Sequence, residues 1–199
     1  SGDPDASYPR GFRPIAATDT LRRARQNRER VLESIATVQP APNVTGISVV
    51  AASGDIHEYG LYVLVAVLEE LGCTVHNLGT SVDNDRIVAA AAETAADAIA
   101  LSTYNGMALS LSAELLQKLE ERGIQPHVFV GGRLTEDLEG EKSADVRSRM
   151  TDLGAMPCDT VEEMVAALDS LRTDLGRVPA QRPAGDHSGN VGASTSVTD

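Results

Sequence analysis

Short apolar runs alternate with longer amphipathic segments along most of the chain. The runs are rich in Val, Ile, Ala and Leu, which is typical of parallel strands buried on both faces. They predict strands over residues 46–52, 73–79, 97–102, 127–130 and 155–157. Apolar residues recur at helical spacing over 61–71, 83–95, 108–122 and 144–153, and a capping box at 160–163 opens a last helix. This alternation predicts an α/β fold, a doubly wound five-stranded parallel sheet of flavodoxin-like type.

The two ends of the chain do not continue the alternation. Residues 1–17 contain three prolines and little periodicity, so we expect an extended arm. Residues 18–42 are predicted to form an Arg-rich helix and a linker, and residues 43–175 the α/β domain. Residues 176–199 are dominated by Pro, Gly, Ser and Thr, and we expect this tail to be disordered.

The helix predicted at 18–38 has a thin apolar stripe and many arginines. The stripe consists of Leu21, Val31, Leu32 and Ile35. The arginines are Arg22, Arg23, Arg25, Arg28 and Arg30, and with Arg10 and Arg13 they place seven of the 17 basic residues in the first 30 positions. The pattern leaves two interpretations open: a solvated helix that packs on its own domain, or a basic element that docks on another subunit.

Charge and composition exclude several classes of function. The net charge is −12 and the sequence pI about 4.7, which argues against nucleic acid or an anionic membrane as the partner. No apolar stretch approaches the length of a membrane span, and the first residues lack the pattern of a signal peptide. Cys73 and Cys158 have neither metal nor disulfide spacing, so we expect a reduced cytoplasmic protein.

The best candidate for chemistry is the segment 54–60 between the first strand and the following helix. Such a loop lies at the carboxyl edge of the sheet, where open α/β sheets bind ligands. His57 offers an imidazole that can bind a metal ion, and Asp55 can hold the other ring nitrogen, fix the tautomer and raise the ligand's basicity. Gly60 lets a ligand approach the backbone. The segment predicts a ligand site with His57 as a metal ligand.

Two further loops are predicted to reach the same edge of the sheet. Ser102, Thr103 and Tyr104 lie at the end of the third strand, and their hydroxyl groups can hydrogen-bond a nucleotide-like ligand. Gly131 and Gly132 end the fourth strand, where the absence of side chains admits a bulky group. Their joint placement predicts one extended site.

These residues carry a resemblance to cobalamin-binding domains of B12-dependent mutases and methyltransferases. Asp55, His57 and Gly60 match the family pattern Asp-x-His-x-x-Gly. The Gly-Gly motif is present at Gly131 and Gly132. In the Ser-x-Leu motif, which begins at Ser102, Tyr104 stands in place of Leu. The resemblance runs from about residue 46 to 172 and is strongest to the small subunit of glutamate (methylaspartate) mutase and the cobalamin domain of methylmalonyl-CoA mutase.

The resemblance implies a cofactor, a reaction and a partner. The cofactor would be adenosylcobalamin bound base-off and His-on, with His57 replacing dimethylbenzimidazole as the lower cobalt ligand. The expected cofactor-binding residues are Asp55, Ile56, His57, Gly60, Ser102, Thr103, Tyr104, Gly131 and Gly132. The chain would be a subunit of an isomerase that performs a radical carbon-skeleton rearrangement. Its substrate pocket would lie in a large TIM-barrel subunit, because a barrel takes roughly 250 residues of its own.

The substrate and two other functions remain open at this stage. Residues 90–99 resemble the glutamate mutase subunit, whereas an Arg-rich helix before the domain is more like the linker region of acyl-CoA mutases. A methyl-carrying corrinoid protein would share the Asp-x-His-x-x-Gly loop but usually has a helical bundle before it. A B12-sensing module would need an output domain. The predicted function is therefore a mutase subunit, with these two alternatives.

Overall fold

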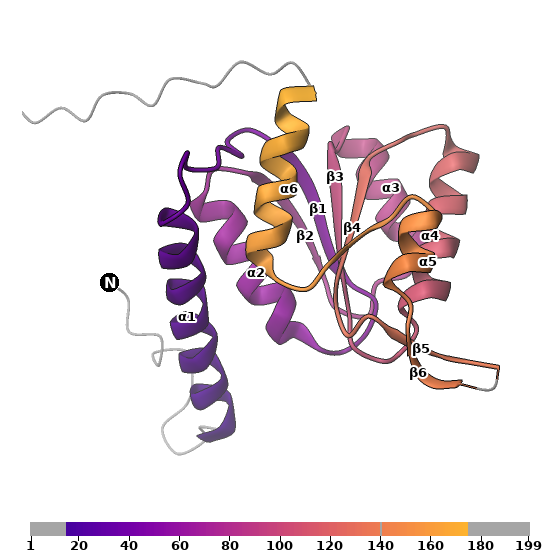
Figure 1. Cartoon of the computed structure of the whole chain (residues 1–199), viewed down its shortest axis with the longest axis horizontal. Helices are drawn as coiled ribbons and strands as arrows, with labels where there is room; N and C mark the ends of the chain where they lie inside the picture. Colours follow the sequence, from indigo (N-terminus) through magenta and orange to yellow (C-terminus); the bar gives the residue numbers. More distant parts are fainter. Residues whose placement is uncertain (1–14, 140, 175–199) are drawn as a thin grey trace, which may run out of the picture.

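A computed structural model describes residues 15–139 and 141–174 (Figure 1). The predicted tail and the first 14 residues of the predicted arm lie outside the described residues. The main sheet contains β1 (Ser48–Ser53), β2 (Thr74–Gly79), β3 (Ala98–Thr103), β4 (His127–Gly132) and β7 (Met156–Cys158). A separate antiparallel pair is formed by β5 (Thr135–Leu138) and β6 (Glu141–Asp145). The helices are α1 (Ile15–Ala36), α2 (Glu58–Glu70), α3 (Asn84–Thr94), α4 (Ala108–Arg122), α5 (Arg147–Asp152) and α6 (Val161–Asp174).

The strand order in the main sheet is β2-β1-β3-β4-β7, and every neighbouring pair is parallel. This is the flavodoxin-like order. The chain adds strands on one side of β1 and then on the other, and the switch between β1 and β3 leaves a ligand crevice at their carboxyl ends. The predicted fold is confirmed. The loops that carry His57 and Tyr104 follow the carboxyl ends of β1 and β3, and Gly132 is the last residue of β4.

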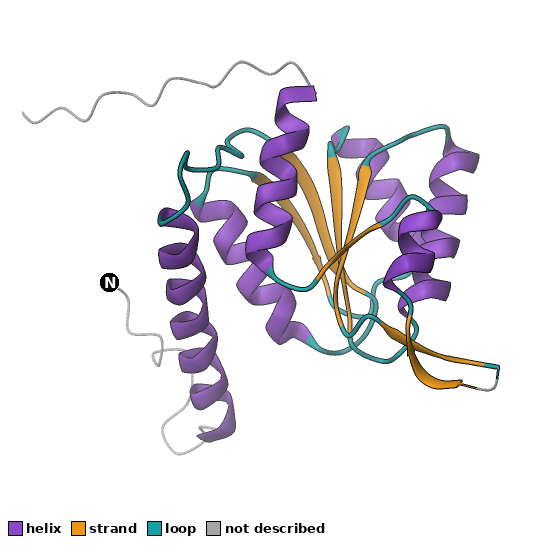
Figure 2. Ribbon diagram, viewed as in Figure 1, coloured by secondary structure: helices purple, strands orange, loops and turns teal. Residues whose placement is uncertain are grey.

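Helices cover both faces of the sheet (Figure 2). Successive strand residues point to opposite faces, so Val49 and Ala51 join the cluster under α1, α2 and α6, whereas Val50 and Ala52 join the cluster under α3, α4 and α5. All four of these residues are fully buried. Burial on both faces explains why the strands are continuous apolar runs in the sequence.

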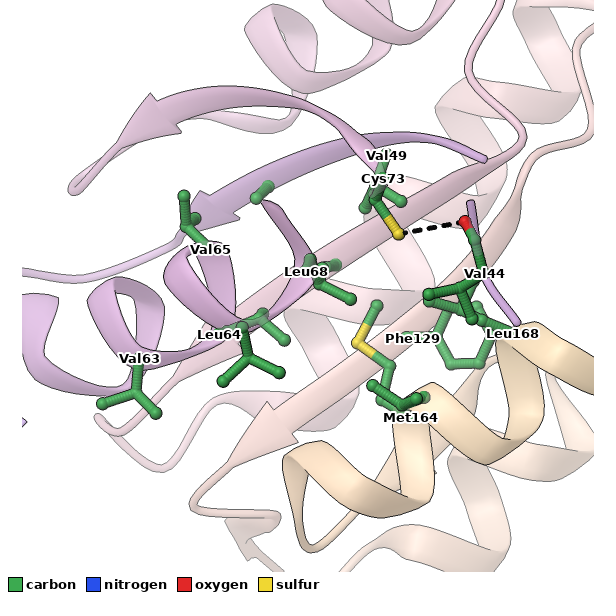
Figure 3. Packing of buried hydrophobic residues seen from close by; sticks show 14 of the residues in the cluster. Val44, Val49, Val63, Leu64, Val65, Leu68, Cys73, Phe129, Met164 and Leu168 are labelled. Atoms are coloured by element: carbon green, nitrogen blue, oxygen red, sulfur yellow. Dashed lines mark hydrogen bonds between the residues drawn. The ribbon is translucent and has the colours of Figure 1, made fainter. Parts of the chain in front are cut away.

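The first of these clusters packs α2 and α6 against the sheet (Figure 3). Leu64 and Leu68 of α2 lie near Phe129 of β4, with Met164 of α6 beside them. Because this cluster lies directly beneath the groove described below, its packing sets the spacing between α2 and α6.

Helix α1 packs on its own domain. It begins at Ile15, three residues before the predicted start, and buries Ala24, Val31 and Ile35 in the first cluster. Val63 and Val67 lie on the side of α2 turned away from the sheet and are only 2% and 0% exposed. Since α1 lies along α2 (Figure 1), α1 supplies the cover that buries these valines.

The outer face of α1 differs from the predicted stripe. Leu21 is 43% exposed, because the first turns of α1 extend past the end of α2 (Figure 1). Arg28 lies 3.7 Å from Glu70 of α2 in an ion pair. The other arginines of the helix face solvent, namely Arg22, Arg23, Arg25 and Arg30. Whether they dock on another subunit stays a prediction.

The prediction of a helix over 144–153 is wrong at its start, where Ala144 and Asp145 belong to β6. The hairpin β5–β6 is too polar to show a strand pattern and is held by tertiary contacts. The carboxylate of Glu136 accepts hydrogen bonds from the amides of Leu109 and Ser110 at the start of α4, at 2.8 and 2.9 Å. These contacts, which stabilise a helix N-terminus, fix the hairpin beside the β3–α4 loop.

No helix within the described ranges is long and apolar enough to cross a membrane.

Candidate functional site

The β1–α2 loop is organised by the side chain of Asp55. Its Oδ1 accepts a hydrogen bond from the backbone amide of His57 at 2.9 Å, an Asx turn that aspartate forms with the amide two residues on. The hydroxyl of Ser53, which is fully buried at the end of β1, donates to the same oxygen at 3.4 Å. The turn ends at His57, which occupies the N-cap position of α2 without a capping hydrogen bond from its side chain.

The imidazole of His57 is held at one edge and open at the other. Its Nδ1 lies 3.0 Å from Asp55 Oδ1. The side chain of His57 is 54% exposed, whereas that of Asp55 is 7% exposed. In the part of the chain that the structure describes, no group hydrogen-bonds Nε2. When Nδ1 carries the proton and donates it to Asp55, a neutral imidazole keeps the lone pair of Nε2 available for a metal ion.

The second carboxylate oxygen of Asp55 reaches a different loop. Oδ2 accepts hydrogen bonds from the backbone amides of Tyr104 at 2.5 Å and Asn105 at 3.2 Å. Burial alone would raise the pKa of Asp55, but the hydrogen bonds from His57 and Tyr104 outweigh it and lower the pKa below its usual value. One ionised carboxylate therefore ties the β1–α2 loop to the β3–α4 loop.

A groove opens beside this loop, between α2 and α6 at the carboxyl edge of the sheet. Its cavity has a volume of about 90 Å³. It is lined by Gly60, Leu64, Ala100, Leu101, Ser102, Phe129, Val130, Gly131, Gly132, Cys158, Asp159, Thr160, Val161 and Met164. The deep part is apolar and the polar groups are few, which is the usual character of a site for an organic ligand.

The structure brings four of the predicted residues together in this groove: Gly60, Ser102, Gly131 and Gly132. A β-carbon on Gly60 would lie 3.5 Å from the hydroxyl of Ser102, so the glycine keeps that wall open. Thr103 does not line the groove. It is 1% exposed, and its hydroxyl hydrogen-bonds Asn105 at 3.2 Å.

Two other predicted residues lie at the edge beside His57. Ile56 is 78% exposed and Tyr104 is 55% exposed. The rings of Tyr104 and His57 are 4.9 Å apart between centroids and tilted by 49°. Apart from the buried Thr103, the predicted residues therefore divide into a groove set and a set around the imidazole.

The prediction missed the wall of the groove that comes from the end of the chain. β7 and the start of α6 supply Cys158, Asp159, Thr160, Val161 and Met164. A signal was available: the fifth parallel strand ends at the same edge as the other four. The sequence also gave no reason to single out Ser53, whose contact with Asp55 depends on the turn.

The described residues contain no group of three or more His, Cys, Asp or Glu side chains placed to hold a metal ion. His57 thus offers one imidazole beside an apolar groove. A single protein ligand suits a metal ion whose other ligands come from an organic cofactor.

Comparison with known proteins identifies the family. Residues 45–170 match the B12 binding domain. This chain belongs to the B12-binding domain family. The match covers the whole main sheet and the groove, whereas α1 precedes it. The flavodoxin-like sheet, the His57 loop and the groove are therefore parts of a cobalamin-binding domain.

Two relatives are glutamate mutase sigma subunits. That of Halobacterium salinarum is 30% identical over 122 residues, covering 61% of this chain and 80% of the relative. That of Carboxydothermus hydrogenoformans is 33% identical over 129 residues, covering 61% of this chain and 89% of the relative.

Solved structures share the fold at lower identity. A cobalamin-binding protein from Desulfitobacterium hafniense superposes with a TM-score of 0.56 at 20% identity, covering 75% of this chain and 70% of the other. The monomethylamine corrinoid protein of Methanosarcina barkeri gives a TM-score of 0.53 at 18% identity, covering 80% and 72%. At these identities the likeness shows the fold alone.

Proposed function

We propose that this chain is the cobalamin-binding small subunit of an adenosylcobalamin-dependent carbon-skeleton mutase. The observation that carries the proposal is the His57 imidazole, which is anchored to a buried carboxylate through Nδ1 and exposed at its other edge. The relatives named glutamate mutase sigma subunit favour the glutamate type over the acyl-CoA type.

The residues present fit a cobalamin bound through histidine. His57 would supply a cobalt ligand, and Asp55 would fix the tautomer that leaves Nε2 available. Ile56 and Tyr104 are exposed beside His57 and would contact the cofactor. Thr103 would act through its backbone, which lies next to Gly132.

The groove would hold the dimethylbenzimidazole base of the cofactor, which a histidine ligand displaces from cobalt. A base that leaves cobalt needs an apolar slot close to the imidazole, and the groove begins at Gly60, three residues after His57. Gly131 and Gly132 keep one wall free of side chains, and Leu64, Phe129 and Met164 make the deep part apolar. Ser102 is one of the few polar groups of the lining and would orient the nucleotide tail.

When bound, adenosylcobalamin supplies homolysis of a cobalt–carbon bond, and the protein contributes binding, orientation and exclusion of water. In this proposal the chain's own residues perform the binding and orientation. A larger catalytic subunit would bind the substrate, in keeping with the relatives' designation as sigma subunits of glutamate mutase. The loaded chain alone should therefore not isomerise glutamate, methylmalonyl-CoA or isobutyryl-CoA, and isomerisation by the isolated chain would contradict this division of roles.

Electron paramagnetic resonance of the cobalt(II) form tests the cobalt ligand. Protein labelled uniformly with nitrogen-15 should change the nitrogen splitting from a triplet to a doublet, because the bound nitrogen comes from the protein and not from the cofactor. His57→Ala should lose the doublet. His127→Ala is the control, because His127 begins β4 at the opposite edge of the sheet. A triplet in the labelled wild-type protein would overturn the proposal.

Substitution of the anchoring carboxylate gives a graded second test. Asp55→Asn should weaken cobalamin binding roughly tenfold to hundredfold, the loss typical when the partner of a metal-binding histidine is removed. Unchanged affinity in this variant would show that Asp55 serves the fold alone.

A further inference from the structure

Tyr104 and His57 come from different loops and meet at the carboxyl edge of the sheet. Their ring centroids lie 4.9 Å apart and the planes are tilted by 49°. Tyr104 is 55% exposed, so burial of its ring does not account for its position. Its hydroxyl has no hydrogen bond within the described residues. The contact with the imidazole is the interaction that the tyrosine side chain makes at this edge.

The backbone around Tyr104 is fixed from two sides. Asp55 Oδ2 accepts hydrogen bonds from the backbone amides of Tyr104 and Asn105. The other oxygen, Oδ1, accepts a hydrogen bond from the backbone amide of His57. From β4, the amide of Arg133 donates to the carbonyl oxygen of Thr103 at 2.7 Å. The relative position of the two backbone segments that carry these rings is thus set by a buried carboxylate and by the sheet.

Asp55 and Tyr104 restrict different motions of the imidazole. The hydrogen bond to Nδ1 decides which nitrogen faces away from the protein, but it still permits the ring to rotate about that bond. A second ring against the imidazole obstructs this rotation. Tilted aromatic pairs at this separation are attractive in addition to the surface that they bury.

We propose that Tyr104 is a positioning residue that holds the His57 imidazole in the orientation in which Nε2 meets cobalt. This inference rests on the proposed function and deepens it. It assigns the role to the ring of Tyr104 and not to its hydroxyl. It also gives the β3–α4 loop a part in cobalt ligation, although no side chain of that loop would touch cobalt.

The test compares variants of Tyr104 in nitrogen-15-labelled chain reconstituted with cob(II)alamin. Tyr104→Phe keeps the ring and should keep wild-type affinity and a full nitrogen doublet. Tyr104→Ala and Tyr104→Leu remove it, and both should weaken binding by roughly twofold to tenfold, as expected for an aromatic pair. At saturating cofactor, both should also show a smaller fraction of cobalt bound to histidine. Tyr62→Ala is the control, because Tyr62 of α2 is similarly exposed at 38% and makes no ring contact with His57 among the described residues.

The outcomes separate this inference from the proposed function. A wild-type protein without the doublet would overturn the proposed function and this inference with it. A wild-type doublet that is unchanged in Tyr104→Ala and Tyr104→Leu would overturn only the role of Tyr104. If Tyr104→Phe fell as far as Tyr104→Ala, the hydroxyl and not the ring would be responsible. A loss of thermal stability with an undiminished doublet would assign Tyr104 to the fold, again against the inference.

Discussion

A β-carbon added to Gly132 would lie 2.1 Å from the carbonyl oxygen of Thr103 on the neighbouring strand. Gly132 also has a φ of +103°, in the region that side chains disfavour. The close approach of β4 to β3 at this point shapes the rim of the groove, because Gly132 lines it. The second glycine of the Gly-Gly pair is therefore required by the sheet itself, before any ligand is considered.

Gly132→Ala should lower the free energy of unfolding by roughly 2–5 kcal/mol, from the left-handed backbone and the collision together. Gly79→Ala is the matched control, because Gly79 has a φ of +85° and nothing lies within 4 Å of its added β-carbon. Gly79→Ala should lower the free energy of unfolding by roughly 1–2 kcal/mol, from the left-handed backbone alone. Urea unfolding curves measure both, and equal losses would show that β3 gives way to the new methyl group.

The carboxylate of Asp55 should make stability fall in acid. Its pKa in the folded chain lies below the usual value of 3.8, so its ionised form favours folding. This stabilisation is complete above about pH 5, roughly one unit above the unfolded pKa, and is lost as the pH falls through the folded pKa. The difference in unfolding free energy between the wild type and Asp55→Asn should therefore shrink between pH 5 and acid values near 2. Chemical denaturation of the cofactor-free proteins across that range checks it, and a constant difference would mean that the charge of Asp55 is unimportant to folding.

The two cysteines can report whether a ligand enters the groove. Burial raises the pKa of Cys158 to about 11, with the charges of Glu163 and Asp159 adding to it, and burial raises that of Cys73 to about 12. Both thiols should react slowly with iodoacetamide at neutral pH, because the thiolate is the reactive form. Cys158 lines the groove, whereas Cys73 is buried beside Val44 at the start of β2 (Figure 3).

Cobalamin should slow the labelling of Cys158 relative to that of Cys73. The ratio of the two rates, read by mass spectrometry, removes the general protection that any stabilising ligand gives through reduced unfolding. Equal protection of both thiols would place the cofactor outside the groove.

Helix α1 should contribute to stability through its buried face. Ile35 is 4% exposed, so Ile35→Ala should lower the free energy of unfolding by roughly 2–5 kcal/mol. Leu21 lies on the same helix at 43% exposure, and Leu21→Ala should change it by no more than about 0.5 kcal/mol. Thermal and urea unfolding measure the pair. Equal and small effects would mean that α1 detaches from α2 in solution.

The sequence by itself determined the elements and the centre of the site. Apolar runs predicted the five strands of the main sheet, because a parallel sheet covered on both faces leaves no polar alternation in its strands. The spacing of Asp55 and His57 sufficed for the Asx turn and for the contact between the Asp55 carboxylate and His57 Nδ1, since both are made within three residues of chain. The family resemblance rested on this motif and on the shorter ones at Ser102 and at Gly131 and Gly132, and the match over residues 45–170 confirmed it.

Tertiary structure decided everything that depends on residues far apart in the chain. The contact of Asp55 with Tyr104 spans 49 positions, and the groove needs β7 and α6 beside β4. Glu136 attaches the hairpin β5–β6 to the start of α4. Helix α1 packs on valines of α2 whose pattern in the sequence resembled that of any buried helix. Local spacing fixes which side chains can meet within a turn, but only the folding of the sheet brings its distant loops to one edge. That is why the sequence could name His57 and Tyr104, while the contact between their rings and the far wall of the groove came from the fold.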